Sequence, residues 1–362
     1  MSKKPVLYKV IVVGVIVIFL VISITPSVAI DNIKKLSLPI SSSNTLYVGG
    51  TGEGNYSSIQ DAINDAVDGD TVFVYDDSSP YYEYLLIDKS ISLVGEIKWR
   101  TIINGDDEIE QHIIRITADR VNIQGFTIQD CAFLGEFYAG IMVNSDNNSI
   151  YGNILTNNPR NLWLKSSSNN KIYNNIITKS KRDGPGIKLN GGGNNEIFNN
   201  IISEVGIGID ILESSSNSIY KNNISKTAWD SIHLYGIPQS GCYNRIYNNI
   251  ITNAKTGIFL GGPCKLNFVY LNDIKSCRKY GCSLYETISA FIVKNNFHNN
   301  SCNAYFFSKS IRNLWIRNYW DDWNGWRSYK IVGKTYRWND PEGDYVTVYQ
   351  YDRLPAAKPF VI

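Results

Sequence analysis

One short pattern, Asn-x-Ile-x-x-Asn-x-Ile, recurs along most of this chain and constrains its fold more than any other feature. It is clearest at residues 170–177, which read Asn-Lys-Ile-Tyr-Asn-Asn-Ile-Ile. Similar stretches, some with substitutions, begin at Val121, Asn148, Asn195, Asn217, Asn244, Asn267, Ala290 and Asn313. Successive starts lie 22 to 27 residues apart, and a period in this range predicts a repeat architecture in which each unit packs on the next.

A second pattern keeps phase with the first. A small residue is followed by an apolar, a variable and an apolar residue, as in Gly186-Ile187-Lys188-Leu189. Each repeat therefore holds two or three short strands with period-two alternation, and no repeat has apolar residues at helical spacing. Strands this short bury their apolar faces only by stacking on the next coil, about 4.8 Å away. The two patterns predict an all-β right-handed parallel β-helix of about ten to twelve coils.

The start of the chain differs from the repeats. Lysines precede an apolar run, Val10–Ile24, and small residues follow at 27–29, which is the layout of a secretory signal peptide. The run is shorter than a membrane span, which needs about 20 residues, and this favours a cleaved signal peptide. An uncleaved N-terminal anchor is the alternative. We predict a signal peptide at 1–29 and a linker at 30–45. The protein would then be secreted or held at the cell surface, and would meet a membrane only through an uncleaved first segment.

Both ends of the repeat region have features of caps. The predicted β-helix covers residues 46–317 and opens with an amphipathic helix over residues 56–67, which would cover the exposed core and strand edges of the first coil. Residues 318–362 form a predicted C-terminal cap that begins with a segment rich in Trp and Gly. A patch that contacts glycan is the alternative role for three of its side chains, Trp320, Trp323 and Trp326.

Several segments resemble one known family. Residues 58–63 (Ser-Ile-Gln-Asp-Ala-Ile), 68–74 (Asp-Gly-Asp-Thr-Val-Phe-Val) and 87–95 are similar to the opening of NosD-type repeat proteins of the pectin-lyase-like superfamily. Residues 114–128 resemble the next coil of that family, and 318–323 resemble its closing coil. The resemblance implies the β-helix fold. It says less about activity, because such proteins include surface proteins, carbohydrate-binding or sugar-hydrolysing modules and maturation factors for metalloenzymes.

The second asparagines of the repeat have a structural explanation. Asn tolerates left-handed backbone at bends, and its amide can bond to the adjacent coil. We therefore expect a ladder of asparagines rather than a set of ligand-binding residues.

The variable residue of the second pattern is more informative, because it points outward between two inward neighbours. In chain order these residues are Arg115, Met142, Trp163, Lys188, Asp210, His233, Phe259, Ser283 and Phe306. Neighbouring rungs would place them about 5 Å apart in one row. Two residues further along the same strands, Lys165, Asn190 and Tyr235 would widen this surface, with Glu213 nearby.

Aromatic rings that flank polar groups suit a sugar chain, which has apolar ring faces and hydroxyl edges. We expect the row from Trp163 to Phe259 to bind a polysaccharide or other glycan. A solvated surface, with Lys188 paired to Asp210 and Asp210 to His233, is the simpler interpretation. A third is a polysaccharide hydrolase or lyase in which Asp210 and His233 act as acid and base, although glycoside hydrolysis usually needs two carboxyl groups beside the bond. A fourth interpretation is a non-catalytic scaffold or a maturation factor that acts through contacts with other proteins.

Other classes of function have little support in the sequence. The net charge of +2 is too small to indicate nucleic acid as a partner. The three histidines are not at ligand spacing and the cysteines form no Cys-x-x-Cys set, so we expect no metal site and no cofactor. We expect a monomer. Six cysteines suit an oxidising compartment. Cys242 and Cys264 each precede one of two consecutive Asn motifs, and Cys277 and Cys302 each follow one. We therefore predict two disulfides, Cys242–Cys264 and Cys277–Cys302.

Overall fold

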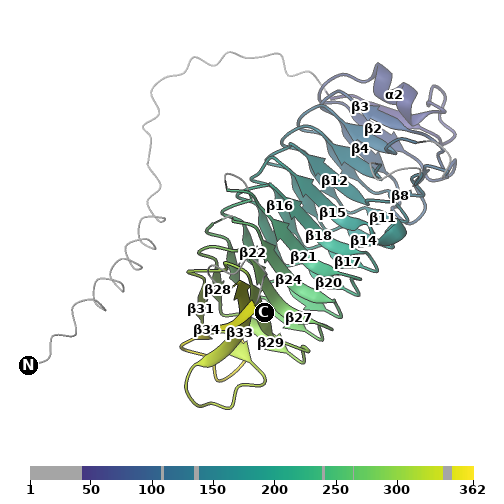
Figure 1. The fold of residues 1–362 in the computed structure, drawn as a ribbon. Coiled ribbons are helices and arrows are strands. Elements are labelled where there is room, and N and C mark those ends of the chain that lie inside the picture. The colour runs from purple at the N-terminus through teal and green to yellow at the C-terminus, as the bar shows by residue number, and fades with distance from the viewer. Residues whose placement is uncertain (1–42, 107–109, 134–137, 239–240, 264, 337–344) are drawn as a thin grey trace, which may run out of the picture. The chain divides into compact units, whose positions relative to one another are not determined.

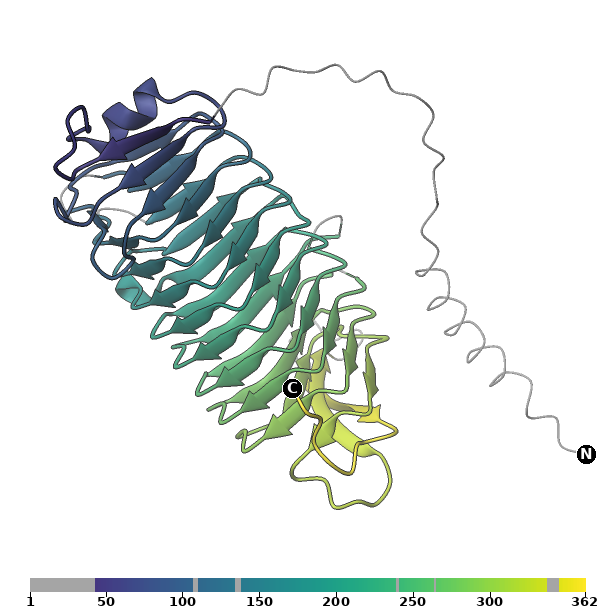
Figure 2. The same cartoon turned by 180° about the vertical axis from the view of Figure 1, so that it is seen from behind.

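The computed structural model describes residues 43–106, 110–133, 138–238, 241–263, 265–336 and 345–362. These residues form a right-handed parallel β-solenoid of about 12 turns (Figures 1 and 2). The predicted signal peptide and most of the predicted linker lie outside them. No helix among the described residues is long and apolar enough to cross a membrane.

Three stacks of parallel strands form the walls of the solenoid. Sheet 1 contains β3 (Leu85–Ile87), β6 (Ile114–Ile116), β9 (Ile141–Val143), β12 (Leu162–Lys165), β15 (Pro185–Asn190), β18 (Ile207–Leu212), β21 (Asp230–Tyr235), β24 (Thr256–Gly261), β27 (Tyr280–Tyr285) and β30 (Ala304–Phe307). Sheet 2 contains β1 (Thr45–Val48), β2 (Thr71–Val74), β4 (Ser92–Gly95), β7 (Asn122–Gln124), β10 (Ser149–Tyr151), β13 (Lys171–Tyr173), β16 (Glu196–Phe198), β19 (Ser218–Tyr220), β22 (Arg245–Tyr247), β25 (Phe268–Tyr270), β28 (Phe291–Val293) and β31 (Leu314–Ile316).

Sheet 3 contains β5 (Ile102–Asn104), β8 (Thr127–Gln129), β11 (Ile154–Thr156), β14 (Ile176–Thr178), β17 (Ile201–Ser203), β20 (Asn223–Ser225), β23 (Ile250–Thr252), β26 (Asp273–Lys275), β29 (Asn296–His298) and β32 (Tyr319–Trp320). The core lies between the three walls, where inward residues such as Ile209, Ile219 and Ile224 are fully buried. This alternation follows from the period of two in each strand, and it confirms the predicted parallel β-helix.

Two ladders of buried asparagines connect the coils at the bends. Asn200 illustrates the geometry: its Oδ1 accepts the backbone N–H of Asn175 (3.0 Å), and its Nδ2 donates to the Ile172 carbonyl (2.9 Å) and to Asn222 Oδ1 (3.0 Å). The same contacts repeat from coil to coil. The ladders therefore satisfy backbone groups that a bend would otherwise leave buried without partners.

The outer face of sheet 2 carries a stack of rings. Adjacent rings of Tyr151, Tyr173, Phe198, Tyr220, Tyr247 and Tyr270 have centroids 4.8 to 4.9 Å apart and nearly parallel planes. This spacing equals the distance between coils, because the rings belong to residues that pair in register on adjacent strands.

The first coil is covered by a helix shorter than predicted, α2 (Ile59–Asp65). Ser58 caps it by accepting the backbone N–H of Asp61 at 3.3 Å, and Ile59, Ala62 and Ile63 are buried against the first strands. The helix breaks at Ala66, whose backbone is extended. A one-turn 3₁₀ segment (Lys181–Asp183) interrupts a later bend. The capping role of α2 stays a prediction.

The repeat ends in an antiparallel hairpin formed by β33 (Tyr329–Tyr336) and β34 (Tyr345–Asp352), which pair parallel to β30 and β31. Trp320 is buried, and its Nε1 donates to Asp352 Oδ2 at 3.2 Å. Trp326, in contrast, is 80% exposed. A glycan-contacting patch of Trp320, Trp323 and Trp326 is therefore wrong, because Trp320 belongs to the core.

The structure corrects one of the two predicted disulfides. Cys277 and Cys302 both carry thiols. Cys277 lies level with Asn300, whose Oδ1 accepts its backbone N–H at 2.9 Å, and its side chain is buried in the core. The Cys302 thiol instead donates to the Ala304 carbonyl at 3.3 Å. Cys264 lies outside the described residues, so the bond predicted between Cys242 and Cys264 stays a prediction.

Candidate functional site

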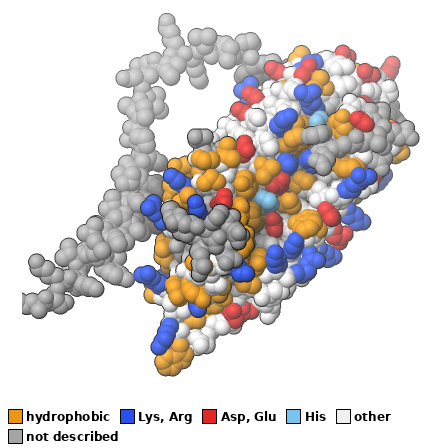
Figure 3. Space-filling view, in the orientation of Figure 1, with side chains coloured by type: hydrophobic (Ala, Val, Ile, Leu, Met, Phe, Trp, Pro, Cys, Tyr) orange, Lys and Arg blue, Asp and Glu red, His pale blue; other side chains and the backbone are white. Residues whose placement is uncertain are grey.

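Sheet 1 brings the predicted row into register. Arg115 pairs with Met142, Met142 with Trp163, and the pairing continues through Lys188, Asp210, His233, Phe259 and Ser283. Figure 3 shows the molecule in the orientation of Figure 1, with Lys and Arg side chains interspersed among hydrophobic ones on its surface. Side chains that are 21 to 27 residues apart in the chain therefore become neighbours on one sheet.

The prediction for the last member of the row, Phe306, is wrong. Ser283 pairs with Tyr305, whereas Phe306 pairs with Leu284 and is buried in the core. The repeat shifts by one residue at this coil, and a shift of one residue moves a side chain to the other face of a strand. Tyr305 takes the outward position.

Several outward residues are nevertheless well covered. Trp163 is 7% exposed and Met142 is 4% exposed, and both pack with Ala139 in a small cluster outside the main core. Asp210 is 5% exposed. Arg160 and Lys165 lie over the Trp163 ring, and Lys188 lies beside Asp210. Outward orientation in the row therefore does not mean full exposure to solvent.

Charged side chains in the middle of the row are paired. Lys188 Nζ lies 3.4 Å from Asp210 Oδ2, as one of the sequence interpretations expected. Burial raises the pKa of the Asp210 carboxyl, and the nearby Lys188 and His233 side chains oppose this rise only in part. Protonation of Asp210 is therefore easier than for an exposed aspartate.

His233 contacts a residue of its own strand. Its Nδ1 lies 3.3 Å from Asp230 Oδ2, and its ring packs on Phe259 with centroids 4.8 Å apart. The expected pairing of His233 with Asp210 is thus replaced by a pairing with Asp230. The sequence could have indicated this pair, because Asp230 begins the strand that carries His233 and lies three residues before it.

The second column of the site also follows the register. Lys165 pairs with Asn190, Asn190 pairs with Leu212, and Leu212 pairs with Tyr235. Tyr235 is followed by Gly261, where a side chain would collide with the Phe259 and Tyr235 rings. The eight predicted substrate-binding residues therefore lie on one sheet: Trp163, Lys165, Lys188, Asn190, Asp210, His233, Tyr235 and Phe259. Their binding role stays a prediction.

Two residues beside Trp163 were missed as part of the site. The guanidinium carbon of Arg160 lies 4.9 Å from the centre of the Trp163 ring, and Lys165 Nζ lies 5.4 Å from it. His112 packs edge-on against the same ring at 6.2 Å. Burial, followed by the charges of Arg115, Arg160 and Lys165, lowers the pKa of His112 to about 4. Arg160 directly precedes the repeat motif that contains Trp163, so its position could have indicated a place beside that ring. No feature of the sequence indicated that His112 would lie there.

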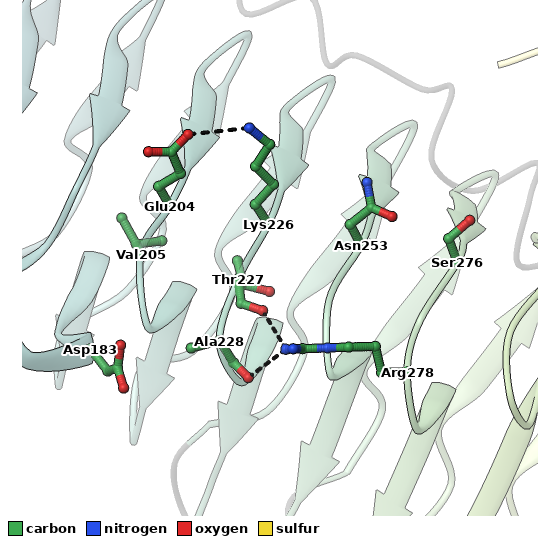
Figure 4. A pocket seen from close by; sticks show the side chains of 9 residues that line it. All are labelled: Asp183, Glu204, Val205, Lys226, Thr227, Ala228, Asn253, Ser276 and Arg278. Carbon is green, nitrogen blue, oxygen red and sulfur yellow. Dashed lines mark hydrogen bonds and ion pairs between the residues drawn. The ribbon is translucent and has the colours of Figure 1, made fainter.

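A hollow of about 470 Å³ lies at the bends that lead from sheet 3 into sheet 1 (Figure 4). Arg278 crosses it, and its Nη2 donates to the carbonyls of Thr227 (3.2 Å) and Ala228 (3.0 Å). At its edge Lys226 Nζ lies 3.2 Å from Glu204 Oε1. None of the predicted site residues lines this hollow.

No group of three or more His, Cys, Asp or Glu side chains in the described part of the chain is placed to hold a metal ion. The three histidines lie on different coils, and each contacts other side chains: His112 contacts Trp163, His233 contacts Asp230, and His298 contacts Asp273.

Solved structures share this fold at low sequence identity. The A-module of the mannuronan C-5 epimerase AlgE4 from Azotobacter vinelandii is 14% identical, with a TM-score of 0.58 over 72% of this chain and 81% of that one. The Dettilon tailspike protein is also 14% identical, with a TM-score of 0.55 over 76% of this chain. This chain spans 61% of the tailspike chain. These likenesses show the fold alone. No curated protein matches the sequence.

Two family models match the sequence. One, described as a right-handed β-helix region, matches residues 185–320. The other, described as periplasmic copper-binding protein (NosD), matches residues 63–249, which is more than half of the chain. The chain belongs to the NosD family.

Proposed function

We propose that this protein is exported and binds a glycan along the row from Trp163 to Phe259. One observation carries the proposal: five consecutive rungs of sheet 1 place an indole, an ammonium, a carboxyl, an imidazole and a phenyl ring side by side. Export is supported by the signal-peptide layout of residues 1–29 and by the periplasmic family description.

The chemistry of the row suits a sugar chain. Sugar rings have apolar faces that pack on aromatic side chains, and hydroxyl edges that bond to polar groups. Phe259 and Tyr235 supply partly exposed rings at one end. Between the ends, Lys188, Asn190 and His233 supply donors and acceptors that are not fully buried. An extended ligand that lies across the rungs would meet these groups in succession.

The neighbours in structure support a glycan as the class of ligand. One of these neighbours is an epimerase of mannuronan, and two others are tailspike proteins. At 14% identity or less, these proteins share the fold with this chain rather than a set of residues, and the epimerase is an example of the fold that acts on a polymer.

A catalytic role has weaker support than binding. Asp210 is 5% exposed and pairs with Lys188, so it is better placed to hold the Lys188 side chain than to reach a bond in a ligand. The family description names copper. The described histidine, cysteine and carboxylate side chains form no group that fits a metal ion, so the proposed function includes no copper chemistry.

Loss of the aromatic contacts tests the proposal. In calorimetry against ligands found on a glycan array, Phe259→Ala and Trp163→Ala should each bind about five- to tenfold more weakly, since an aromatic contact contributes about 1 kcal/mol or more. Tyr220→Ala, which removes a ring from sheet 2, is the matched control and should bind like the wild type. Melting temperatures would show that each variant is folded, which matters most for the covered Trp163.

No measurable binding of any glycan by the wild type would refute the proposal. Equal losses in the Tyr220 control would place binding elsewhere. The same incubations can be assayed for reducing or unsaturated ends, and we expect none to be released.

A further inference from the structure

The Trp163 end of the row differs from the Phe259 end in charge. We propose that the end around Trp163 is an anion-binding subsite, which takes the carboxylate or sulfate groups of an acidic glycan. This inference rests on the proposed glycan binding and adds the chemical class and the direction of the ligand.

Four cationic side chains surround Trp163. Arg160 and Lys165 lie against its ring at 4.9 and 5.4 Å. Arg115 is two rungs before it in the row, and Lys188 is on the next rung. Arg115 and Lys165 are exposed. The positive charge therefore comes from three sheet strands and one bend and converges on one ring.

The indole itself lacks a hydrogen-bond partner. Trp163 is more than nine-tenths buried, and its Nε1–H meets no acceptor among the described residues. A buried donor without a partner costs free energy, so a ligand that supplies an acceptor gains affinity by relieving this cost. Lys165, one of the two side chains over the ring, is exposed, and rotation of its long side chain would admit the oxygen of an anionic group.

Two of these cations, Arg115 and Lys165, form no ion pair with the described residues. Asp210 is the single carboxylate in the row, and Lys188 occupies it. His112 accepts the Ala139 backbone N–H at Nδ1 (3.1 Å) and is neutral at pH 7, since burial and then the neighbouring cations lower its pKa to about 4. An anion at this end would therefore meet the positive charges of Arg115 and Lys165.

The other end of the row has a different character. Phe259, Ser283 and Tyr305 carry no charge, and His233 is held by Asp230. An acidic glycan would place a charged group near Trp163 and rest an uncharged ring face on Phe259. This gives the ligand one orientation along the solenoid.

Paired ligands that differ only in charge test the subsite. Oligogalacturonate can be compared with its methyl ester, and dextran sulfate with dextran, by calorimetry on the full-length protein. We expect the charged member of at least one pair to bind about tenfold or more tightly, as charge-assisted hydrogen bonds predict. The pair that shows the difference tells carboxylate from sulfate. Added salt should weaken this binding, because it screens the exposed cations.

Lys165→Gln should reduce the preference for the charged ligand over its neutral counterpart about fivefold to tenfold. Trp163→Phe, which keeps a ring but removes the N–H, should do the same. Lys221→Gln is the matched control, because Lys221 is exposed at a bend between sheets 2 and 3. Neutral and charged ligands binding equally well would overturn the subsite and leave glycan binding intact. No binding of any ligand would overturn the proposed function itself.

Discussion

At the residue scale, His112 shows how neighbours set the state of one side chain. Its Nδ1 accepts a backbone N–H, and its ring lies against Trp163 with three cations close by. Burial and then the charges of Arg115, Arg160 and Lys165 lower its pKa from 6.5 to about 4. The neutral form is therefore the one that the folded protein favours.

This shift predicts a loss of stability in acid. A histidine whose pKa is lower in the folded state contributes fully above its ordinary pKa of 6.5, and the contribution is lost as the pH falls toward 4. After allowance for partial exposure, the loss should be about 1 to 3 kcal/mol. Thermal melts of the wild type and His112→Gln between pH 7 and pH 4 measure it.

The variant should lose less stability than the wild type over this range, because glutamine keeps an acceptor but does not titrate. His298→Gln, which leaves His112 in place, should follow the wild type. Parallel pH profiles for the wild type and His112→Gln would contradict the interpretation.

The orientation of the row could be predicted at this scale, but its burial could not. Period-two alternation is local, so it correctly turned Lys188, Asp210 and His233 outward. Exposure depends on what covers a side chain, and for Trp163 the cover comes from Arg160 and Lys165, which the repeat pattern does not place over the ring. For the same reason, the partner of His233 was missed.

At the scale of elements, the stacked strands and asparagine ladders depend on phase from coil to coil. The spacing of the Asn motifs predicted this phase through most of the chain. It failed for Phe306, because the outward position of this coil falls one residue earlier, at Tyr305, than the motif suggested. It failed also for Cys277 and Cys302, which occupy different levels of adjacent coils. Sequence spacing thus predicts which strands pair better than it predicts contacts at the bends.

The ladder predicts a large effect from one amide. Asn200→Ala removes two donated and two accepted hydrogen bonds in the interior and leaves the Ile172 carbonyl and Asn175 N–H groups without them. Chemical unfolding should show a loss of about 3 kcal/mol or more.

The adjacent residue offers the matched control. Asn199 is an exposed bend residue with φ of 53°, and Lys221 occupies the equivalent bend of the next coil with φ of 54°. Asn199→Lys should therefore change the free energy of unfolding by less than about 0.5 kcal/mol. Similar losses for the two variants would mean that the ladder is not what stabilises the bend.

At the scale of the whole solenoid, each coil interacts chiefly with the coils before and after it. The fold class followed from the repeat alone, whereas the terminal hairpin did not, because β33 and β34 have no repeat to place them. We therefore expect the three-walled stack to tolerate removal of a complete coil.

Deletion of residues 196–217 tests this. It removes one 22-residue step, the distance between Asn195 and Asn217 along the ladder, and places Asn195 where Asn217 would meet Asn244. The shortened chain should keep a β-sheet circular dichroism spectrum and a cooperative melt. Deletion of residues 196–206, which is half of the same step, should abolish both because strands of different sheets would then face each other. A folded half-step variant would be incompatible with the coil as the unit of structure.

The unequal lengths of the coils have a consequence for how such a chain diversifies. Steps of 22 to 27 residues produce the same strand register, so the additional residues are taken up at the bends. Insertions and losses can accumulate at the corners while the distance between rungs stays constant. One outward side chain can then be exchanged at a time, and a lineage can change what it recognises without rebuilding its interior.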